Sequence, residues 1–156
     1  MRVAFGPFMR SGKDTACLFL RERYGGKILS FSWLLYKACD QLQKTLGIPV
    51  EKDRPLLLQI GAYAKEKDPL VFVKQVREQI ELHNKDNIFV SDVRRKEEAD
   101  MLKQQGFLLV KILRDTEREY SEMEEKAAAL DVWDIVLENN GTIQEFEAIL
   151  EQILGQ

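Results

Sequence analysis

The sequence predicts an α/β fold in three layers, with helices on both faces of a parallel, five-stranded sheet. Two observations predict this fold. Short apolar runs alternate along the chain with longer stretches of helical periodicity, which is typical of parallel strands joined by helices. The apolar runs carry few polar side chains on either face, as strands do when helices cover both faces of their sheet. Ligands of such folds bind beyond the carboxyl ends of the strands, so functional residues are expected there.

Glycine residues mark where the first two helices end. Gly25-Gly26 follows the first helix and Gly47 follows the second, because glycine readily adopts the backbone conformation that closes a helix. The strands are short apolar runs between such breaks. Strands are expected over residues 3–5, 27–31, 88–90, 107–113 and 135–137, and helices over residues 14–24, 34–46, 54–67, 97–105 and from 142 onward.

Two further helix starts carry local signals. Pro69 is expected in the first turn of a helix, where proline is favoured, and Phe72, Val76 and Ile80 would share one face of that helix. Thr142 is expected to cap the last helix, because Glu145 three residues later completes the pattern of a capping box. Both starts depend on residues that are close together in the sequence.

The length and charge of the chain limit the possible classes of protein. A chain of 156 residues is expected to form one domain, since single domains commonly contain about 100–200 residues. With 45% hydrophobic and 31% charged residues, it needs neither disulfides nor metals to build a core. The formal net charge of −3 argues against a general nucleic-acid binder, which requires a broad basic surface. A local phosphate pocket needs only a few donors and is compatible with this charge.

Cellular location is inferred from segments that the sequence lacks. We find no apolar run of the roughly 18 residues needed to cross a bilayer, and no signal peptide before the first strand. Cys17 and Cys39 lie in apolar helical segments and are expected to be buried, reduced thiols. We therefore expect a cytoplasmic protein without membrane contact. Its oligomeric state is left open.

The segment between the first strand and the first helix reads Gly6-Pro7-Phe8-Met9-Arg10-Ser11-Gly12-Lys13-Asp14-Thr15. A chain that turns from a strand into a helix presents unpaired N–H groups at the positive end of the helix, and these can surround a phosphate. Gly12 lets the backbone approach the anion without a Cβ, and Lys13 can reach the β- and γ-phosphates. Strand, loop and helix in this order are the context that a P-loop requires.

This loop departs from the usual P-loop pattern at two positions. Pro7 stands where a glycine is usual, with Gly6 one position earlier. Asp14 stands where serine or threonine is commoner, and Thr15 follows it. The Thr15 hydroxyl could contact the α-phosphate, while Asp14 could hold a water bound to magnesium. The alternative interpretation is a strand, turn and helix with a chance Gly-Lys pair, which the agreement of other segments disfavours.

A carboxylate follows the apolar run 88–90, at Ser91-Asp92. In P-loop proteins this position lies across from the loop and beside the metal, so Asp92 is expected to orient the metal shell or the acceptor oxygen. Arg94 would place a guanidinium beside the transfer zone, where the phosphoryl oxygens develop charge. Alternatively, Arg94, Arg95 and Lys96 are a solvated helix start, although three cations there oppose the helix dipole.

Together these segments resemble the phage-type deoxynucleoside monophosphate kinases, a family of P-loop nucleotide kinases. The stretch from Ser11 to Thr15 is similar to the family's P-loop, and the stretch from Ser91 to Arg94 resembles its Asp-x-Arg segment. Leu58-Gln59-Ile60-Gly61 resembles its Leu-Gln-x-x-Gly stretch, which helps form the acceptor side. Asn139-Asn140-Gly141-Thr142 resembles the turn that lies near the adenine. The matches are discontinuous but follow the same order over nearly the whole chain.

The resemblance implies a three-layer P-loop NTPase fold of the nucleoside monophosphate kinase-like form. It implies that ATP and Mg²⁺ are the cofactors and that a (deoxy)nucleoside monophosphate accepts the phosphoryl group. Ala62 and Lys65 depart from the threonine and arginine that the family tends to have. Two alternatives are therefore kept: a kinase for another small phosphorylated acceptor, of the dephospho-coenzyme A or phosphomevalonate type, and a nucleotide-binding regulator that has lost transfer.

A charged stretch runs from Arg114 to Lys126 after the long apolar strand. In a helix over this stretch, Arg114 and Arg118 would lie on one face, and Glu122 and Lys126 would continue it with opposite charges. By itself this pattern favours a solvated helix. The resemblance places the family's mobile lid here, and such a lid closes over ATP and brings arginines to the phosphates. The two interpretations are compatible.

The candidate sites combine the residue patterns with the resemblance. One domain is expected over 1–156, with an acceptor-binding helical segment at about 32–68 and a lid-like segment at about 114–130. The expected catalytic residues are Lys13, Asp92, Arg94 and Arg118. The expected ATP-binding residues are Arg10, Ser11, Gly12, Lys13, Asp14, Thr15, Arg114, Asn140 and Gly141. The expected acceptor-binding residues are Ser32, Lys37, Arg54, Gln59 and Lys65, and the expected Mg²⁺ ligands are Asp14, Thr15 and Asp92.

Overall fold

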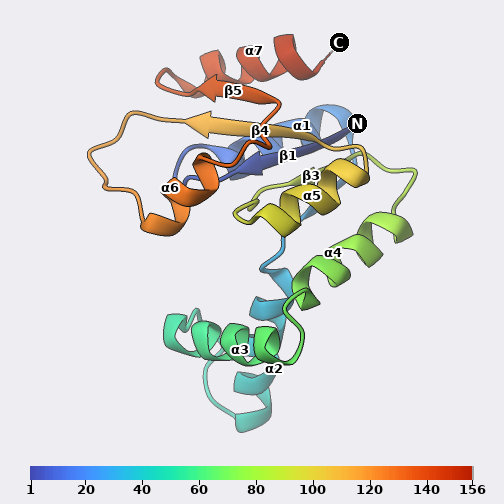
Figure 1. Ribbon diagram of the computed structural model, residues 1–156, viewed down its shortest axis with the longest axis vertical. Coiled ribbons are helices and arrows are strands. Elements are labelled where there is room, and N and C mark those ends of the chain that lie inside the picture. Colours follow the sequence, from blue (N-terminus) through green and yellow to red (C-terminus); the bar gives the residue numbers. More distant parts are fainter. Residues whose placement is uncertain (156) are drawn as a thin grey trace.

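A computed structural model describes residues 1–155, and Gln156, the last residue of the expected domain, lies outside the described residues. The strands are β1 (Arg2–Gly6), β2 (Lys27–Leu29), β3 (Ile88–Val90), β4 (Leu108–Leu113) and β5 (Ile135–Glu138). The helices are α1 (Lys13–Tyr24), α2 (Trp33–Leu46), α3 (Arg54–Lys67), α4 (Val71–Leu82), α5 (Lys96–Gln104), α6 (Glu122–Ala128) and α7 (Ile143–Leu154). The strands pair in parallel in the order β2-β3-β1-β4-β5 (Figure 1), which confirms the expected five-stranded parallel sheet.

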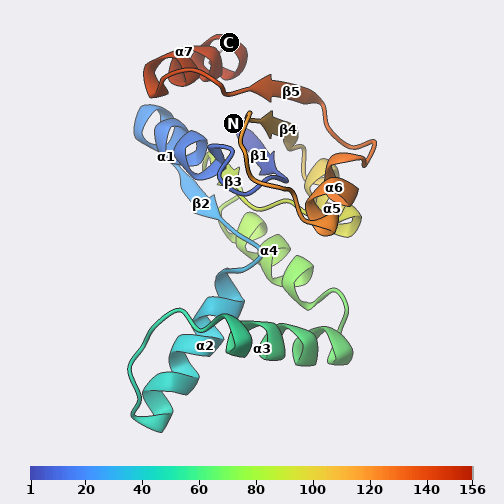
Figure 2. The ribbon, with the colours of Figure 1, turned by 90° about the vertical axis from the view of Figure 1, so that its left-hand side faces the viewer.

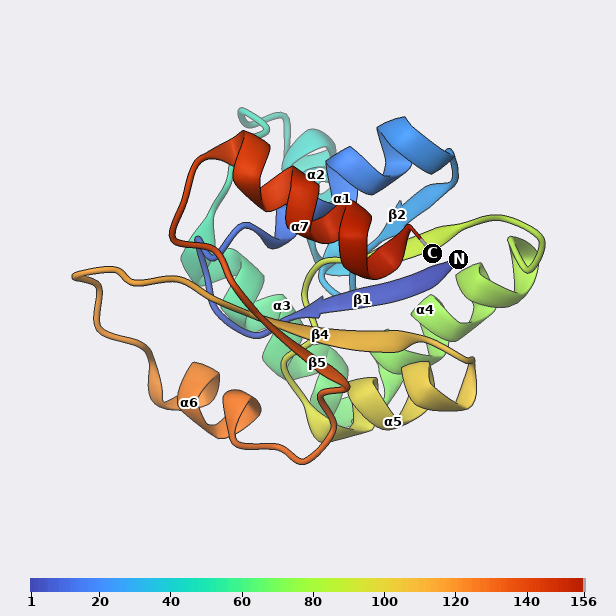
Figure 3. The same cartoon turned by 90° about the horizontal axis from the view of Figure 1, so that it is seen from above.

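Helices cover both faces of this sheet. In Figure 3, α1 and α7 lie on one face, and α4 and α5 lie on the other. The buried side chains form one hydrophobic core on each face of the sheet, and successive residues of β1 belong to these cores alternately. Val3 and Phe5 pack with α1 and α7, whereas Ala4 packs with α4 and α5. Because both faces are buried, the strands show no polar alternation. Cys17, in the core under α1 and α7, and Cys39 in α2 are both buried and free, as expected.

The helices α2 and α3 form an arm that extends away from the sheet (Figure 2). Gly47 closes α2 with a φ of 68°, in the left-handed region that favours glycine. Asp53 caps α3, where its carboxylate accepts the Leu56 N–H at 3.0 Å. The arm lies within residues 32–68, the segment expected to bind the acceptor. Among residues 1–155, no helix has the length and apolar character needed to span a membrane.

Two expected boundaries near the arm are wrong. The second strand ends at Leu29, and not at residue 31, because Ser30 and Phe31 donate hydrogen bonds to the carboxylate of Asp92, which follows β3. Pro69 lies in a turn before α4, and not in its first helical turn. The Asp68 carboxylate accepts the Leu70 N–H at 3.0 Å and its carbonyl accepts the Val71 N–H at 3.1 Å, which delays the helix.

The expected helix in the charged stretch is wrong in its first half. Residues 114–121 are not helical, so Arg114 and Arg118 do not share a helical face. The helix begins at Glu122, since the Ser121 side chain accepts the backbone N–H three residues later, at 3.3 Å. The second half is as expected, because Glu122 and Lys126 form an ion pair of 2.5 Å on α6.

Candidate active site

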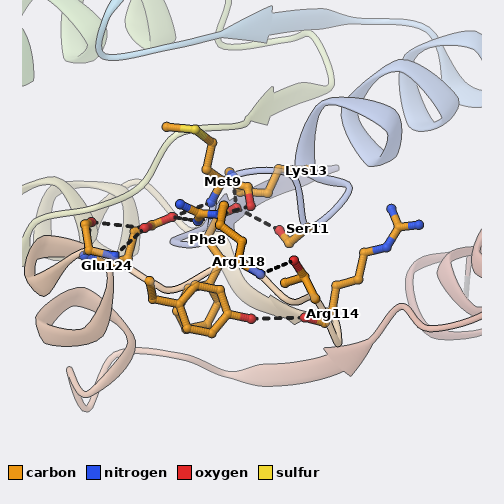
Figure 4. Close-up of polar contacts among 10 residues, drawn as sticks. Phe8, Met9, Ser11, Lys13, Arg114, Arg118 and Glu124 are labelled. Atoms are coloured by element: carbon orange, nitrogen blue, oxygen red, sulfur yellow. Dashed lines mark hydrogen bonds and ion pairs between the residues drawn. The ribbon is translucent and has the colours of Figure 1, made fainter.

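The expected phosphate loop joins the end of β1 to the start of α1 at the carboxyl edge of the sheet (Figure 4). Its interior is filled by Lys13, whose side chain folds back and donates to the Phe8 carbonyl. The Ser11 hydroxyl donates to the same carbonyl at 2.9 Å. Burial lowers the pKa of the Lys13 ammonium below its usual range, and the nearby positive charge of Arg94 lowers it further. The loop thus holds a buried cation at the position where a phosphate is expected.

Gly12 is required at its position for two reasons. Its φ of 109° lies in the left-handed region, which side-chain-bearing residues rarely adopt. In addition, a Cβ at Gly12 would lie 2.5 Å from Nδ2 of Asn139. That amide donates to the Ser11 carbonyl at 2.8 Å and ties the loop to the end of β5. Asn139 was not among the candidate site residues, because its partner lies 128 positions away in the sequence.

The next two residues after Asn139 were expected to contact ATP. Asn140 accepts the Asp115 N–H at 2.7 Å through its side-chain oxygen, and so links the turn after β5 to the charged stretch. Asn140 and Gly141 line an open pocket of about 560 Å³ beside α7. At the start of α1, Asp14 is exposed, as is Arg10 on the loop, which has a φ of 60°.

Asp92 connects the sheet to the arm. Its Oδ2 accepts the Ser30 hydroxyl at 2.9 Å, the Ser32 N–H at 3.1 Å and the Ser32 hydroxyl at 3.0 Å. Its Oδ1 accepts only the Phe31 N–H, at 2.9 Å. The carboxylate therefore fixes the chain at the start of α2. Ser32, one of the expected acceptor residues, is thus hydrogen-bonded to Asp92, one of the expected catalytic residues.

Arg94 lies near enough to Lys13 for its charge to act on that residue, and it forms no ion pair within the described part of the chain. Its Nε is buried without a hydrogen-bond partner, and no described carboxylate forms an ion pair with its guanidinium. The backbone N–H groups of Arg94 and Arg95 donate to Glu98 at 2.8 and 3.0 Å. Burial raises the pKa of the Glu98 carboxyl to about 7, although these two hydrogen bonds act in the opposite direction. Lys13 and Arg94 thus bring two positive charges to the carboxyl edge of the sheet, and the carboxylates of Asp14, Glu124 and Asp92 partly offset the charge of Arg94 at Lys13.

Arg118 reaches the loop through a residue that sequence analysis missed. Its guanidinium lies 2.5 Å from Oε1 of Glu124, and that oxygen also accepts the Met9 N–H at 2.7 Å (Figure 4). Burial by itself raises the pKa of Glu124, but the hydrogen bonds from Arg118, Met9 and Ser121 outweigh it and lower the pKa to about 2. The Ser-x-x-Glu pattern could have identified Glu124 as a capping residue, but not as a contact of the loop.

Arg114 does not join this cluster. Its carbonyl accepts the Tyr120 hydroxyl at 3.0 Å, while its exposed side chain points away from Arg118 and Glu124 in Figure 4. The charged stretch therefore brings one of its two expected arginines to the loop.

The expected acceptor residues on the arm are only partly brought to the site. Lys65 packs 5.8 Å from the centre of the Phe72 ring and is half-buried. Burial lowers the pKa of Lys65, and the positive charge of Arg95 lowers it further. By contrast, Arg54 and Gln59 are exposed on α3. Lys37 is also exposed and lies 5.4 Å from the centre of the Trp33 ring.

The residues expected to hold Mg²⁺ fit a cation that takes oxygen ligands and keeps several waters. Thr15 and Asp14 lie in the first turn of α1, and Oδ1 of Asp92 accepts one hydrogen bond and so has a second lone pair available. In the described part of the chain, no group of three or more His, Cys, Asp or Glu residues could hold a metal by itself. Such a cation would therefore share its ligands with nucleotide oxygens.

Two viral proteins are similar to this chain in sequence, whereas no family model matches it. A protein of Acanthamoeba polyphaga mimivirus, provisionally named a deoxynucleotide monophosphate kinase, is 30% identical. That match covers 87% of this chain and 86% of the viral protein. The uncharacterised protein ORF77 of Ictalurid herpesvirus 1 (strain Auburn) is 34% identical, and the match covers 93% of this chain but 66% of ORF77.

Two solved kinases share the fold. Shikimate kinase from Aquifex aeolicus has a TM-score of 0.59 at 18% identity, over 99% of this chain and 97% of that chain. Dephospho-CoA kinase from Campylobacter jejuni has a TM-score of 0.56 at 17% identity, over 98% of this chain and 94% of that chain. At these identities the likeness establishes the three-layer P-loop fold, while the substrates of the two enzymes carry no information about this chain.

Proposed function

Because the chain belongs to the deoxynucleoside monophosphate kinase family within the P-loop nucleotide kinases, we propose that it transfers the γ-phosphoryl group of ATP to a (deoxy)nucleoside monophosphate. Kinase activity follows from the family, and the acceptor is the proposed part. The observation that carries the proposal is the unpaired Arg94 guanidinium beside the buried Lys13 ammonium. Two neighbouring positive charges that form no ion pair with a described carboxylate suit a site that is completed by phosphates.

The proposed transfer is an in-line displacement at the γ-phosphorus. An oxygen of the acceptor phosphate forms a bond to this phosphorus, and the bond from the phosphorus to the β,γ-bridging oxygen breaks. ADP leaves with that electron pair, and the acceptor becomes a nucleoside diphosphate. The attacking oxygen is already ionised at neutral pH, so no strong general base is required. Lys13, Arg94 and Arg118 would supply fixed donors to the oxygens on which charge spreads.

Asp14, Thr15 and Asp92 would hold the Mg²⁺ of the nucleotide, which supplies charge neutralisation between the phosphates. Asp92 would act in a second way through its bonds to the start of α2, because these bonds attach the base of the arm to the sheet edge next to the P-loop. Arg10, Ser11 and Gly12 would contact ATP from the loop. Correct positioning of two bound substrates lowers the barrier by avoiding the entropy cost of their encounter.

The acceptor is proposed to bind between the sheet edge and the arm, in the segment 32–68. Lys65 supports this placement because it is half-buried and the positive charge of Arg95 acts on it. A lysine and an arginine whose charges interact could together hold the phosphate of a monophosphate. The exposed residues Lys37, Arg54 and Gln59 would contact the acceptor only if the arm closes over it. Residues 114–130 are proposed to cover ATP, with Arg114, Asn140 and Gly141 at the nucleoside end.

A substrate panel tests this proposal. ADP release is measured with ATP, Mg²⁺ and each ribo- and deoxyribonucleoside monophosphate, and with dephospho-coenzyme A. Lys13→Ala should lower turnover at least about 100-fold, because it removes a donor to the transferring group. Lys85→Ala is the matched control, since Lys85 is exposed in the turn before β3, at the opposite edge of the sheet.

Three outcomes would contradict the proposal. Near-normal turnover of Lys13→Ala would refute the assigned role of the loop. Transfer to dephospho-coenzyme A, and to none of the monophosphates, would show that the proposed acceptor class is wrong. ATP binding without ADP release for every acceptor would identify a nucleotide-binding regulator.

A further inference from the structure

We propose that Glu124 is a positioning residue for phosphoryl transfer, which holds the Arg118 guanidinium and the tip of the P-loop at Met9 as one unit. The inference rests on the proposed function in one respect, namely that the phosphates of ATP bind at this loop. Glu124 itself would not touch them. It would act through Arg118, which is proposed to donate to the phosphates.

The two carboxylate oxygens of Glu124 have separate partners. Oε2 accepts the Ser121 N–H at 2.9 Å and the Ser121 hydroxyl at 3.0 Å, which completes the capping box of α6. Oε1 accepts the Met9 N–H at 2.7 Å and lies 2.5 Å from the Arg118 guanidinium. Capping therefore requires only Oε2. The contacts of Oε1 join segments that lie 115 positions apart in the sequence.

Another capping box with a hydroxyl cap, at α7, indicates what this kind of capping requires by itself. At the start of α7, Oε2 of Glu145 accepts the Thr142 N–H at 2.7 Å, as Glu124 does for Ser121. Glu145 is exposed, whereas the side chain of Glu124 is only 7% exposed. Burial of an ion pair costs desolvation energy and rarely increases stability over an apolar replacement. The burial of Glu124 is therefore better explained by a role in positioning than by a need of the helix.

The Arg118 guanidinium keeps donors free for a ligand. Its Nη2 contacts Glu124 and lies 3.5 Å from the Met9 carbonyl, while its Nε is buried without a hydrogen-bond partner. A buried donor without a partner is rare in proteins, and a phosphate oxygen would satisfy it. Glu124 thus holds one edge of the guanidinium and leaves another available.

An aromatic contact reinforces the same connection. The Tyr120 ring packs on the Phe8 ring of the loop with a centroid distance of 4.2 Å, and the Arg118 guanidinium lies 5.5 Å from the centre of the Tyr120 ring. The chain that follows Arg118 is therefore anchored to the loop at Phe8. Without the Glu124 carboxylate, only the aromatic contact and the weak contact with the Met9 carbonyl would remain, and neither fixes the direction of the guanidinium.

A double-mutant cycle with Glu124→Gln and Arg118→Ala tests the inference. Steady-state kcat and KM for ATP, the Kd for ATP by calorimetry, and the thermal unfolding midpoint are measured for the wild type, both single variants and the double variant. Glu124→Gln should lower kcat about 10- to 100-fold, the loss expected from misplacing a group by about 1 Å. The loss in the double variant should be smaller than the product of the two single losses, because Glu124 and Arg118 act through a shared contact.

Ser121→Ala is the matched control. It removes the hydroxyl from the same capping box but leaves both contacts of Oε1 in place. It should lower the unfolding midpoint as much as Glu124→Gln does, while kcat stays within about twofold of the wild type. Equal kcat values for Ser121→Ala and Glu124→Gln would overturn the inference, as would additive losses in the cycle.

Failure of the proposed function would be recognised separately. If the wild type binds ATP but phosphorylates no monophosphate, the proposed acceptor class is wrong. The Kd for ATP in the same four proteins then still measures the coupling between Glu124 and Arg118. Non-additive changes in that Kd would then support the role of Glu124, and additive changes would refute it. If the wild type binds no ATP, both the proposed function and the inference are wrong.

Discussion

The Arg94 guanidinium and the Lys13 ammonium lie close enough that the charge of the arginine lowers the pKa of the lysine. Lys13 donates to the Phe8 carbonyl, and the Arg94 side chain has no described partner. Like charges repel each other, and an anion that binds both offsets this repulsion. This pair is therefore the strongest sign in the molecule of a binding site for phosphate groups.

Arg94→Ala is expected to lower kcat by about 100-fold or more, because a fixed donor to the transferring phosphoryl group is lost. The unfolding midpoint should stay the same or rise slightly, since the substitution removes an unpaired cation beside Lys13. Kinetic measurement and thermal unfolding of the same preparation check both parts. Arg77→Ala, on the exposed side of α4, is the control and should leave kcat unchanged. Normal turnover of Arg94→Ala would remove Arg94 from the site.

Gly12→Ala is expected to abolish ATP binding and to destabilise the fold. The new Cβ would lie 2.5 Å from Nδ2 of Asn139, so the bond from Asn139 to the Ser11 carbonyl would have to break. Gly106→Ala is the control, because Gly106 also has a positive φ, of 75°, but its Cβ would meet no atom within 4 Å.

The control should lose about 1 kcal/mol of stability from its backbone conformation and keep its affinity for ATP. Calorimetric titration with ATP and denaturation in urea distinguish the two variants. Equal ATP affinity in both would contradict the role assigned to Gly12.

Stability should depend on pH through Glu98. Burial raises the pKa of this carboxyl from 4.5 to about 7, so the folded protein keeps a proton that the unfolded chain has lost between these two values. The contribution of Glu98 is therefore fully present below pH 4.5 and is lost as the pH rises toward 7. Relative to Glu98→Gln, the free energy of unfolding of the wild type should fall by roughly 3 kcal/mol between pH 5 and pH 8.

Urea denaturation of both proteins at several pH values checks this expectation. Glu124 does not interfere, because its pKa is lowered to about 2 and its contribution changes only below about pH 4.5. Parallel pH profiles for the wild type and Glu98→Gln would show that the Glu98 carboxyl is ionised throughout this range.

Local patterns predicted the fold because each depended on residues a few positions apart. The apolar runs identified all five strands, and the Thr142–Glu145 capping box marked the start of α7. The early end of β2 reflects the contact of Ser30 with Asp92, which is 62 positions away. The other two errors reflect a competing local interaction. At Pro69, the hydrogen bonds of Asp68 delayed the helix, and before α6, the Ser121 cap left Arg114 and Arg118 outside it.

The candidate site was predictable to a smaller extent. The loop around Lys13 and the carboxylate at Asp92 follow from the position of each at a strand end, and the structure places both at the carboxyl edge of the sheet. The contacts that join them to other segments were not predictable. Asp92 meets Ser30 from 62 positions away, and the Asn139 and Glu124 contacts with the loop span more than 100 positions.

The sequence by itself determined the order of strands and helices along the chain, the phosphate loop and the family resemblance. These features depend on neighbouring residues and on where strands end. Only the tertiary structure decided which side chains support the loop. Parallel pairing places the ends of β1, β3 and β5 at one edge of the sheet, and this brings Ser11, Asp92 and Asn139 into one region. The assignment of Glu124 to the loop likewise required the fold, since a capping pattern does not reveal that a second carboxylate oxygen faces Met9.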